Sequence, residues 1–201
     1  MDTQNQTVMG MIRDVGACRT GHFLLRNGKH TDTILECSHL TENTETAERL
    51  CDMLQARCAD CDADLILGTA SGGLVFGYGL ARRLSLPFMY AERREDGYQL
   101  RRGFRIPEHA RVLIVEDIVS TGNTVRQMLG IIRNFGAEPV AVATIVDRTR
   151  GRVRLGIPMI SLAEIEANTY VHTVCPMCKA GIPVSPYGME VRERIRREQH
   201  E

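Results

Sequence analysis

The chain places two adjacent carboxylates and a hydroxyl-rich turn directly after an apolar run. The apolar run is VLIV at residues 112–115, and the segment after it consists of Glu116, Asp117, Ile118, Val119, Ser120, Thr121, Gly122, Asn123 and Thr124. Backbone N–H groups and small hydroxyls at a helix start bind phosphate, and glycine allows close approach. Carboxylates repel phosphate, but they accept hydrogen bonds from ribose hydroxyls or bind magnesium. The combination predicts a sugar-phosphate site, the alternative being solvated acids in an ordinary loop.

Two further loops carry groups that could bind the same ligand. GTASGG at residues 68–73 contains Ala70, Ser71 and Gly72, whose backbone N–H groups can converge on an anion, although such a turn alone is often only a tight turn. DRTRG at residues 147–151 contains Arg148, whose planar guanidinium binds a carboxylate or ring carbonyl at two points, unless it is a surface arginine. The segment 116–124 contains neither GxxxxGK[ST] nor GxGxxG, which disfavours nucleoside triphosphates and NAD as ligands.

These loops need a scaffold that brings them together, and the hydrophobic pattern supplies one. Apolar residues recur at three and four positions over 44–58, which predicts a helix with one buried face. Short apolar strands are predicted at 64–67, 87–90, 112–115 and 140–146, with helices at about 72–84 and 125–135. Alternating strands and helices indicate an α/β fold with a mostly parallel sheet flanked by helices. Its strand ends after residues 67, 115 and 146 should share one edge.

The composition limits the class of protein. The chain has 201 residues, is 43% hydrophobic and carries 25 basic and 25 acidic residues. This length suits one compact domain, and zero net charge gives no electrostatic reason to expect nucleic acid or an anionic membrane as partner. No long apolar run and no secretory pattern occur, so we expect a soluble, cytoplasmic protein.

Seven cysteines do not resemble a secreted disulfide framework, so reduced thiols are expected. The pairs Cys58/Cys61 and Cys175/Cys178 have the spacing of metal ligands, and four thiolates would make a zinc site if the pairs met. Packed thiols are the simpler interpretation for the first pair, because Cys58 continues the apolar stripe of its helix.

A charged segment, AERREDGYQLRRGFR, occupies residues 91–105. It is predicted to be a hairpin or mobile flap whose arginines, Arg93, Arg94, Arg101 and Arg102, could close over a pyrophosphate and shield it from water. The alternative is a solvated excursion without a role.

Taken together, the motifs resemble those of a known family. The segment 112–124 resembles the phosphoribosyl pyrophosphate (PRPP) motif of type I phosphoribosyltransferases. GHFLLRNGKH, TASGG, the charged segment, VDRTRGRVRLGIP and CPMCKAGIPV extend the resemblance to the orotate phosphoribosyltransferase family over the whole chain. The resemblance implies a single domain, 1–201, with a twisted, mostly parallel sheet. It also implies a small hood from about 1–40 and 155–190 and a flexible flap at about 92–104.

The resemblance also implies roles for residues. PRPP would be bound by residues 116–124 together with Ala70, Ser71, Gly72, Arg93 and Arg94; Asp117, Glu116 and Arg93 would be catalytic; and orotate would contact Ser120, Arg148 and Arg26. Magnesium would be held through PRPP without a direct protein ligand, and the flap would serve the neighbouring subunit of a homodimer. Family members often have a flap lysine, whereas Lys29 and Lys179 lie elsewhere, so an arginine must replace it. TASGG likewise lacks the proline and the larger apolar residue that are common in the family.

Two other functions share these motifs. One is phosphoribosyl transfer to a purine base such as adenine or xanthine, which would change the base-binding groups and keep the PRPP loops. The other is a regulator that senses PRPP and binds nucleic acid, which would need a broad basic face that the balanced charge does not favour.

Overall fold

The structure is a computed structural model that describes residues 3–25 and 27–186. The chain forms two compact units. The main unit comprises Met1–Val15 and Cys37–Ile165, and the small unit comprises Gly16–Glu36 and Glu166–Glu201.

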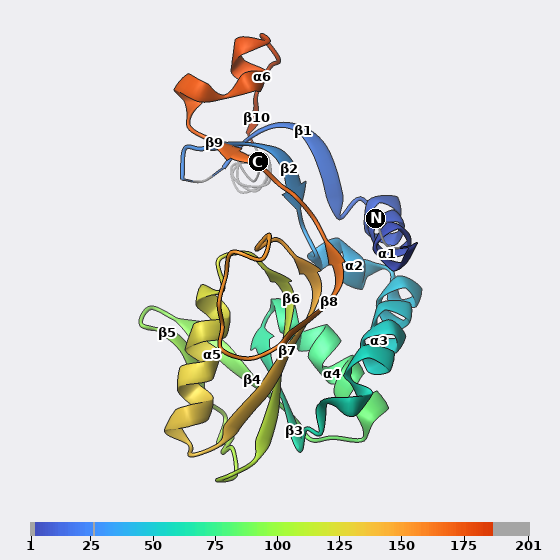
Figure 1. Cartoon of the computed structure of the whole chain (residues 1–201), viewed down its shortest axis with the longest axis vertical. Coiled ribbons are helices and arrows are strands. Elements are labelled where there is room, and N and C mark those ends of the chain that lie inside the picture. Colours follow the sequence, from blue (N-terminus) through green and yellow to red (C-terminus); the bar gives the residue numbers. More distant parts are fainter. Residues whose placement is uncertain (1–2, 26, 187–201) are drawn as a thin grey trace, which may run out of the picture. The chain divides into compact units, whose positions relative to one another are not determined.

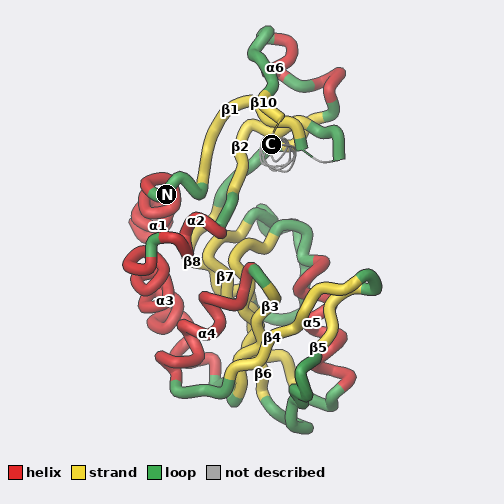
Figure 2. Tube along the Cα trace, turned by 180° about the vertical axis from the view of Figure 1, so that it is seen from behind, coloured by secondary structure: helices red, strands yellow, loops and turns green. Residues whose placement is uncertain are grey.

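A six-stranded sheet forms the centre of the main unit, with strand order β5-β4-β3-β6-β7-β8. Its strands are β3 (Leu65–Ala70), β4 (Phe88–Arg94), β5 (Gly97–Leu100), β6 (Arg111–Val119), β7 (Glu138–Asp147) and β8 (Met159–Glu164). All neighbours are parallel except β4 and β5, which form an antiparallel hairpin at one end of the sheet (Figure 2). The predicted α/β class with a mostly parallel sheet is confirmed, as is the hairpin in the charged segment.

Helices cover both faces of this sheet. The main unit contains α1 (Thr3–Asp14), α2 (Ser38–Glu42), α3 (Thr44–Cys58), the short 3-10 helix η1 (Ala59–Cys61), α4 (Gly72–Leu84) and α5 (Asn123–Asn134). Figure 1 shows α5 on one face and α3 with α4 on the other. The helix predicted at 44–58 is confirmed with these bounds. The side chain of Asn43 caps it by accepting a 2.9 Å hydrogen bond from the backbone N–H of Thr46.

The strand order reverses direction between β3 and β6. The connection through α4 leads from β3 outward to β4, whereas the connection through α5 leads from β6 to β7 on the opposite side. Loops on the two sides of such a reversal diverge, which opens a crevice at the carboxyl edge where α/β proteins bind ligands. The loops after β3 and β6 flank this point.

Four strands are longer than their apolar runs predicted, and one of them is β4, which continues to Arg94 although its run ends at residue 90. β3 continues to Ala70, β6 to Val119 and β7 to Asp147, whereas their apolar runs end at residues 67, 115 and 146. Backbone pairing extends them, since residue pairs such as Glu116–Thr144 remain in parallel register. The backbone ladder does not depend on side-chain polarity, so the carboxylates lie on the end of a strand and not in a loop.

The small unit is built around a four-stranded sheet of order β10-β1-β2-β9 (Figure 1). It contains β1 (Cys18–Leu24), β2 (His30–Leu35), β9 (Thr169–Tyr170), β10 (Ser185–Pro186), the 3-10 helix η2 (His172–Val174) and α6 (Pro176–Lys179). The hood was expected from about 1–40 and 155–190, but α1 and β8 belong to the main unit, where they contact one another. None of the helices in the described part of the chain has the length and apolarity needed to cross a bilayer.

Candidate active site

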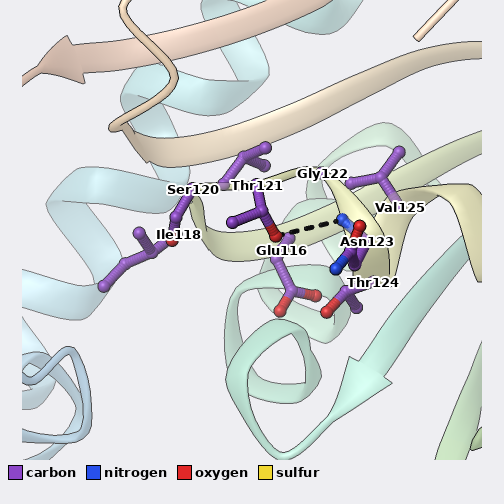
Figure 3. Close-up of a pocket in the computed structure, with 9 residues that line it drawn as sticks. Glu116, Ile118, Ser120, Thr121, Gly122, Asn123, Thr124 and Val125 are labelled. Carbon is purple, nitrogen blue, oxygen red and sulfur yellow. Dashed lines mark hydrogen bonds between the residues drawn. The ribbon is translucent and has the colours of Figure 1, made fainter. Parts of the chain in front are cut away.

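The turn after β6 encloses a small cavity at the carboxyl edge of the sheet. Its volume is about 60 Å3, and it is lined by Glu116, Ile118, Val119, Ser120, Thr121, Gly122, Asn123, Thr124 and Val125 (Figure 3). Pockets that enclose a whole drug-sized ligand measure roughly 300 Å3 or more, so this one suits a single small group such as a phosphate. Every residue of the predicted segment except Asp117 therefore lines the cavity, at the N-terminus of the twelve-residue helix α5.

Gly122 makes the turn possible. It is the N-cap of α5 and has φ of 74°, a left-handed conformation that side chains disfavour. A Cβ at this position would also lie 2.6 Å from Val153 Cγ1, so the space is filled. The cap lets the chain turn from strand to helix within three residues, so that the first residues of α5, Asn123, Thr124 and Val125, line the cavity.

Arg126 supports the turn from the first part of α5. Its Nη1 donates hydrogen bonds to the carbonyl oxygen of Thr121 at 2.9 Å and to Asn123 Oδ1 at 3.3 Å. The backbone N–H of Asn123 in turn donates to Thr121 Oγ1 at 3.5 Å (Figure 3). The guanidinium therefore holds the turn and adds positive charge beside it, a role that the sequence analysis missed.

Glu116 is buried, with 8% of its surface exposed. The hydroxyl of Thr69, on β3, donates a hydrogen bond to Glu116 Oε2, and the backbone N–H of Gly73 donates to that hydroxyl at 3.2 Å. Burial raises the pKa of Glu116 to about 7, against the lowering effect of the Thr69 hydrogen bond and with a further rise from the charge of Asp117. Near neutral pH this carboxyl is therefore partly protonated, which reduces its repulsion of a phosphate.

The raised pKa of Glu116 predicts a pH-dependent stability. The folded protein binds this proton more tightly than the unfolded chain, so its contribution is complete below about pH 4.5 and is lost as the pH rises through about 7. We expect the free energy of unfolding of the wild type to fall by on the order of 3 kcal/mol relative to Glu116→Gln over this window. Urea unfolding of both proteins at several pH values measures the difference. Parallel pH profiles would contradict the assignment.

Asp117 lies where the loops after β3 and β6 meet. Its Oδ1 accepts a 2.7 Å hydrogen bond from the backbone N–H of Ile118, and its carbonyl oxygen accepts one of 3.0 Å from Thr144 Oγ1 on β7. A Cβ added at Gly72 would lie 2.5 Å from Asp117 Oδ1, so the carboxylate packs directly against the first residue of α4. The half-buried Asp117 is therefore fixed by contacts within β6, with β7 and with α4.

The second predicted anion loop adjoins this carboxylate. β3 ends at Ala70, α4 begins at Gly72, and Ser71 between them is exposed; the Ala70–Ser71 peptide bond is cis. The backbone N–H of Leu74 donates to the carbonyl oxygen of Ser71 at 3.2 Å, which starts the helix. The structure thus brings the two predicted loops together at one edge.

Arg148 follows β7 at the same edge. Its backbone N–H donates to the carbonyl oxygen of Val119 at 2.8 Å, next to the turn after β6. Asp147 Oδ1 accepts a 2.6 Å hydrogen bond from the backbone N–H of Thr149, which shapes the turn. Val119 pairs with Asp147, so the next residues, Ser120 and the half-buried Arg148, follow at the same edge of the sheet. The prediction that these loops share one edge is confirmed.

The β4–β5 hairpin reaches the site through Tyr98. The side chain of Tyr98 lies within hydrogen-bonding reach of Thr124 and within range of the charges of Glu116 and Asp117; burial is the largest cause of its raised pKa. Its backbone N–H donates to Gln127 Oε1 on α5 at 2.9 Å. Tyr98 lies in the charged segment 91–105, where the sequence analysis singled out only the arginines.

The hairpin arginines have different surroundings. Glu92 binds Arg94 at 2.9 Å and Arg102 at 2.6 Å, and its hydrogen bond with Arg102 lowers the pKa of Glu92. Arg93 and Arg94 are both exposed. Arg26, the remaining expected orotate contact, lies outside the residues that the structure describes.

Comparison with known proteins shows which family the chain belongs to. The phosphoribosyl transferase domain family matches residues 42–178. An orotate phosphoribosyltransferase of Caldicellulosiruptor bescii is 40% identical over 174 residues, covering 87% of this chain and 92% of that protein. One of Caldanaerobacter subterraneus is 35% identical over 181 residues, covering 90% and 95%.

Solved structures agree on the fold. The crystal structure of orotate phosphoribosyltransferase from Aeropyrum pernix superimposes with a TM-score of 0.70 at 24% identity, covering 79% of this chain and 93% of that one. An adenine phosphoribosyltransferase from Thermoanaerobacter pseudethanolicus gives a TM-score of 0.58 at 22% identity, covering 66% and 88%. The motifs, the switch-point site and the similarity of nearly the whole sequence lead to one assignment. The chain belongs to the phosphoribosyltransferase family and, within it, to the orotate phosphoribosyltransferases.

Proposed function

We propose that this protein transfers phosphoribosyl from PRPP to N1 of orotate, giving orotidine 5-monophosphate and pyrophosphate in UMP biosynthesis. The observation that carries the proposal is the contact between Asp117 and Gly72. It places the acid pair at the end of β6 against the anion loop that follows β3. One molecule with a sugar and two phosphate groups can span both loops. The similarity to orotate phosphoribosyltransferases identifies the base.

The reaction requires little base catalysis, because orotate N1 is already acidic. Positioning of the anomeric carbon and stabilisation of the separating charges then supply most of the rate. The turn 120–124 would hold the 5-phosphate, while Ala70, Ser71 and Gly72 would face the pyrophosphate. Glu116 and Asp117 would accept hydrogen bonds from the ribose hydroxyls, and the negative charge of Asp117 would favour an oxocarbenium-like transition state.

Magnesium fits this set of donors. Its ligands would be phosphate oxygens of PRPP and water, and the Asp117 carboxylate beside the anion loop would add negative charge near the ion. When bound through PRPP it would neutralise charge on the leaving pyrophosphate. Ser120, Arg148 and Arg26 would contact orotate, with Arg148 suited to its carboxylate by the shape of guanidinium.

The proposal is tested by mixing the protein with PRPP, magnesium and orotate. Orotate's ultraviolet absorbance should fall, and the fall should require all three components. Adenine, guanine and xanthine in place of orotate separate this function from transfer to a purine base. Pyrophosphate release with a purine and none with orotate would overturn the assignment of the base.

We further propose a cytoplasmic homodimer in which the flap of one subunit, carrying Arg93 and Arg94, serves the site of its partner. The exposure of Arg93 and Arg94 leaves both side chains accessible to a second chain. None of the seven cysteines, all of which lie among the described residues, forms a disulfide, as a reducing compartment favours.

The shared site predicts complementation between two weakened variants. Arg93→Ala and Asp117→Asn are each expected to have low activity alone. Mixed and allowed to exchange subunits, they should recover about a quarter of wild-type activity, because half the dimers are hybrids and each has one intact site. Activity is followed during exchange, with unmixed variants as controls. If exchange is demonstrated and no activity returns, the flap acts within its own subunit.

A further inference from the structure

Four side chains that can bind a metal gather in the small unit. They are His22 on β1, His30 at the start of β2, and the pair Cys175 and Cys178 at α6. One ligand atom from each lies within 4.8 Å of all the others. His22, His30 and Cys175 are buried and Cys178 is half-buried.

We propose that the small unit binds one structural zinc ion through His22 Nε2, His30 Nδ1, Cys175 Sγ and Cys178 Sγ. Two thiolates and two imidazoles form a ligand set typical of closed, tetrahedral zinc sites. The site differs from the pairing considered in the sequence analysis, because Cys58 and Cys61 belong to the main unit. The inference is independent of the proposed enzymatic reaction.

The distances between ligand atoms suit a zinc tetrahedron. His22 Nε2 lies 3.6 Å from Cys175 Sγ and 3.6 Å from Cys178 Sγ, and His30 Nδ1 lies 3.2 Å from Cys178 Sγ. Bonds of about 2.3 Å to sulfur and 2.05 Å to nitrogen place nitrogen and sulfur about 3.6 Å apart. The two nitrogens, at 2.6 Å, are closer than the about 3.3 Å of such a tetrahedron, so a small outward movement of one ring completes the site.

A backbone carbonyl orients the His22 ring. The carbonyl oxygen of Ile182 lies 2.7 Å from His22 Nδ1, and it can only accept a hydrogen bond, so Nδ1 carries the proton. Nε2, which faces both sulfurs and His30, is then the nitrogen with the free lone pair. Zinc-binding histidines are generally fixed in this way by a hydrogen bond from the other ring nitrogen. This contact does not involve the metal, so the ring is oriented before the ion binds.

The backbone brings the four ligands from two distant parts of the chain. Two residues of β1, Gly21 and His22, lie opposite Asp32 of β2 between regular pairs, which is a β-bulge that re-aims a side chain. On the other part of the chain, the backbone N–H of Lys179 donates to the carbonyl oxygen of Cys175 at 3.2 Å, and that of Gly181 to Cys178 at 3.0 Å. This turn brings the Sγ atoms of Cys175 and Cys178 to the same side of the segment, facing His22.

The small unit also lacks the core that would hold it together otherwise. Ile34 is the one large aliphatic side chain that is buried among the described residues of this unit; the other buried side chains are small, polar or potential ligands. Units of this size usually need a metal, a disulfide or a partner, because their apolar core is too small to stabilise the fold. A zinc ion would link strands β1 and β2 to the segment around α6.

Elemental analysis tests the proposal on untagged, full-length protein purified without added zinc. The wild type is expected to contain about one zinc per chain, and Cys178→Ser to lose it. Cys61→Ser is the matched control, since Cys61 is a half-buried member of the other Cys-x-x-Cys pair and should keep the metal. Zinc retained by Cys178→Ser, or lost to the same degree by Cys61→Ser, overturns the ligand set.

Cobalt provides a readout that does not depend on a variant folding. Cobalt(II) added to wild type after removal of zinc should give the visible absorption of a tetrahedral site with thiolate ligands, and one equivalent of zinc should abolish it. A wild type that contains no metal and binds neither ion in competition with a chelator overturns the proposal. In that case the cluster is a histidine–histidine hydrogen bond surrounded by reduced thiols.

Discussion

Replacing Asp117 by Asn is expected to lower turnover by roughly 10²- to 10³-fold, the usual cost of losing one group that stabilises transition-state charge. The substitution keeps the side chain's shape, and the amide oxygen can still accept the 2.7 Å hydrogen bond from the backbone N–H of Ile118. The negative charge facing the ribose is what disappears. The prediction is checked by steady-state kinetics with PRPP varied at saturating orotate, together with thermal unfolding, which should change little.

Asp64→Asn is the matched control for this substitution. Asp64 Oδ2 also accepts a 2.9 Å hydrogen bond from a backbone N–H, that of Arg111, but it does so at the opposite edge of the same two strands. This variant should retain turnover, because no substrate group lies at that edge in the proposed mechanism. Equal losses in the two variants would show that Asp117 acts through folding, and wild-type turnover in Asp117→Asn would refute its proposed role.

The second large effect is on stability. Gly73→Ala is expected to lower the free energy of unfolding by about 3 kcal/mol or more, because overpacking against a rigid neighbour forces the backbone to move. A Cβ at this position would overlap the carbonyl oxygen of Val115 and lie 3.0 Å from Thr69 Oγ1. Val115 is itself fully buried within β6 and cannot retreat. Helix α4 must therefore move away from β6, which separates the loops that form the site.

Gly130→Ala provides the control for the alanine itself. Gly130 lies within helix α5, and nothing stands within 4 Å of a Cβ added there. This variant should be more stable by about 0.5–1 kcal/mol, because alanine is the better helix former. Urea or thermal unfolding of both variants shows directly whether each substitution lowers or raises the free energy of unfolding. A neutral Gly73→Ala would mean that α4 packs on the sheet less closely than the structure shows.

The order of elements and the residues of the PRPP motif could be predicted from the sequence. Helix α3 has the predicted bounds, since its apolar residues recur at helical spacing and Asn43 precedes them as a cap. The loops after β3, β6 and β7 share one edge, as right-handed crossovers between parallel strands require. These features depend on local patterns of apolar and turn-forming residues, which the sequence displays directly.

Contacts between distant residues could not be predicted in the same way. Thr69 and Glu116 are 47 positions apart, and the pattern GTASGG indicates a backbone role for its loop without linking the Thr69 side chain to Glu116; only the parallel register of β3 and β6 brings the two side chains together. Tyr98 reaches the site because the hairpin packs on α5. Strand pairing by the backbone, which carries no side-chain signal, also extended the strands beyond their apolar runs.

The cysteines also show which features the sequence predicts and which only the tertiary structure decides. Their Cys-x-x-Cys spacing marked Cys175 and Cys178 as possible ligands, but that spacing alone suggested Cys58 and Cys61 as their partners. The structure brings His22 and His30 to the sulfurs instead. Burial raises the pKa of Cys58 to about 12, as expected of a packed thiol.

Sequence determines which residues can bind a ligand and how adjacent elements follow one another, because both depend on neighbours in the chain. Tertiary packing decides which candidates meet, because pairing and burial depend on residues far away in the sequence.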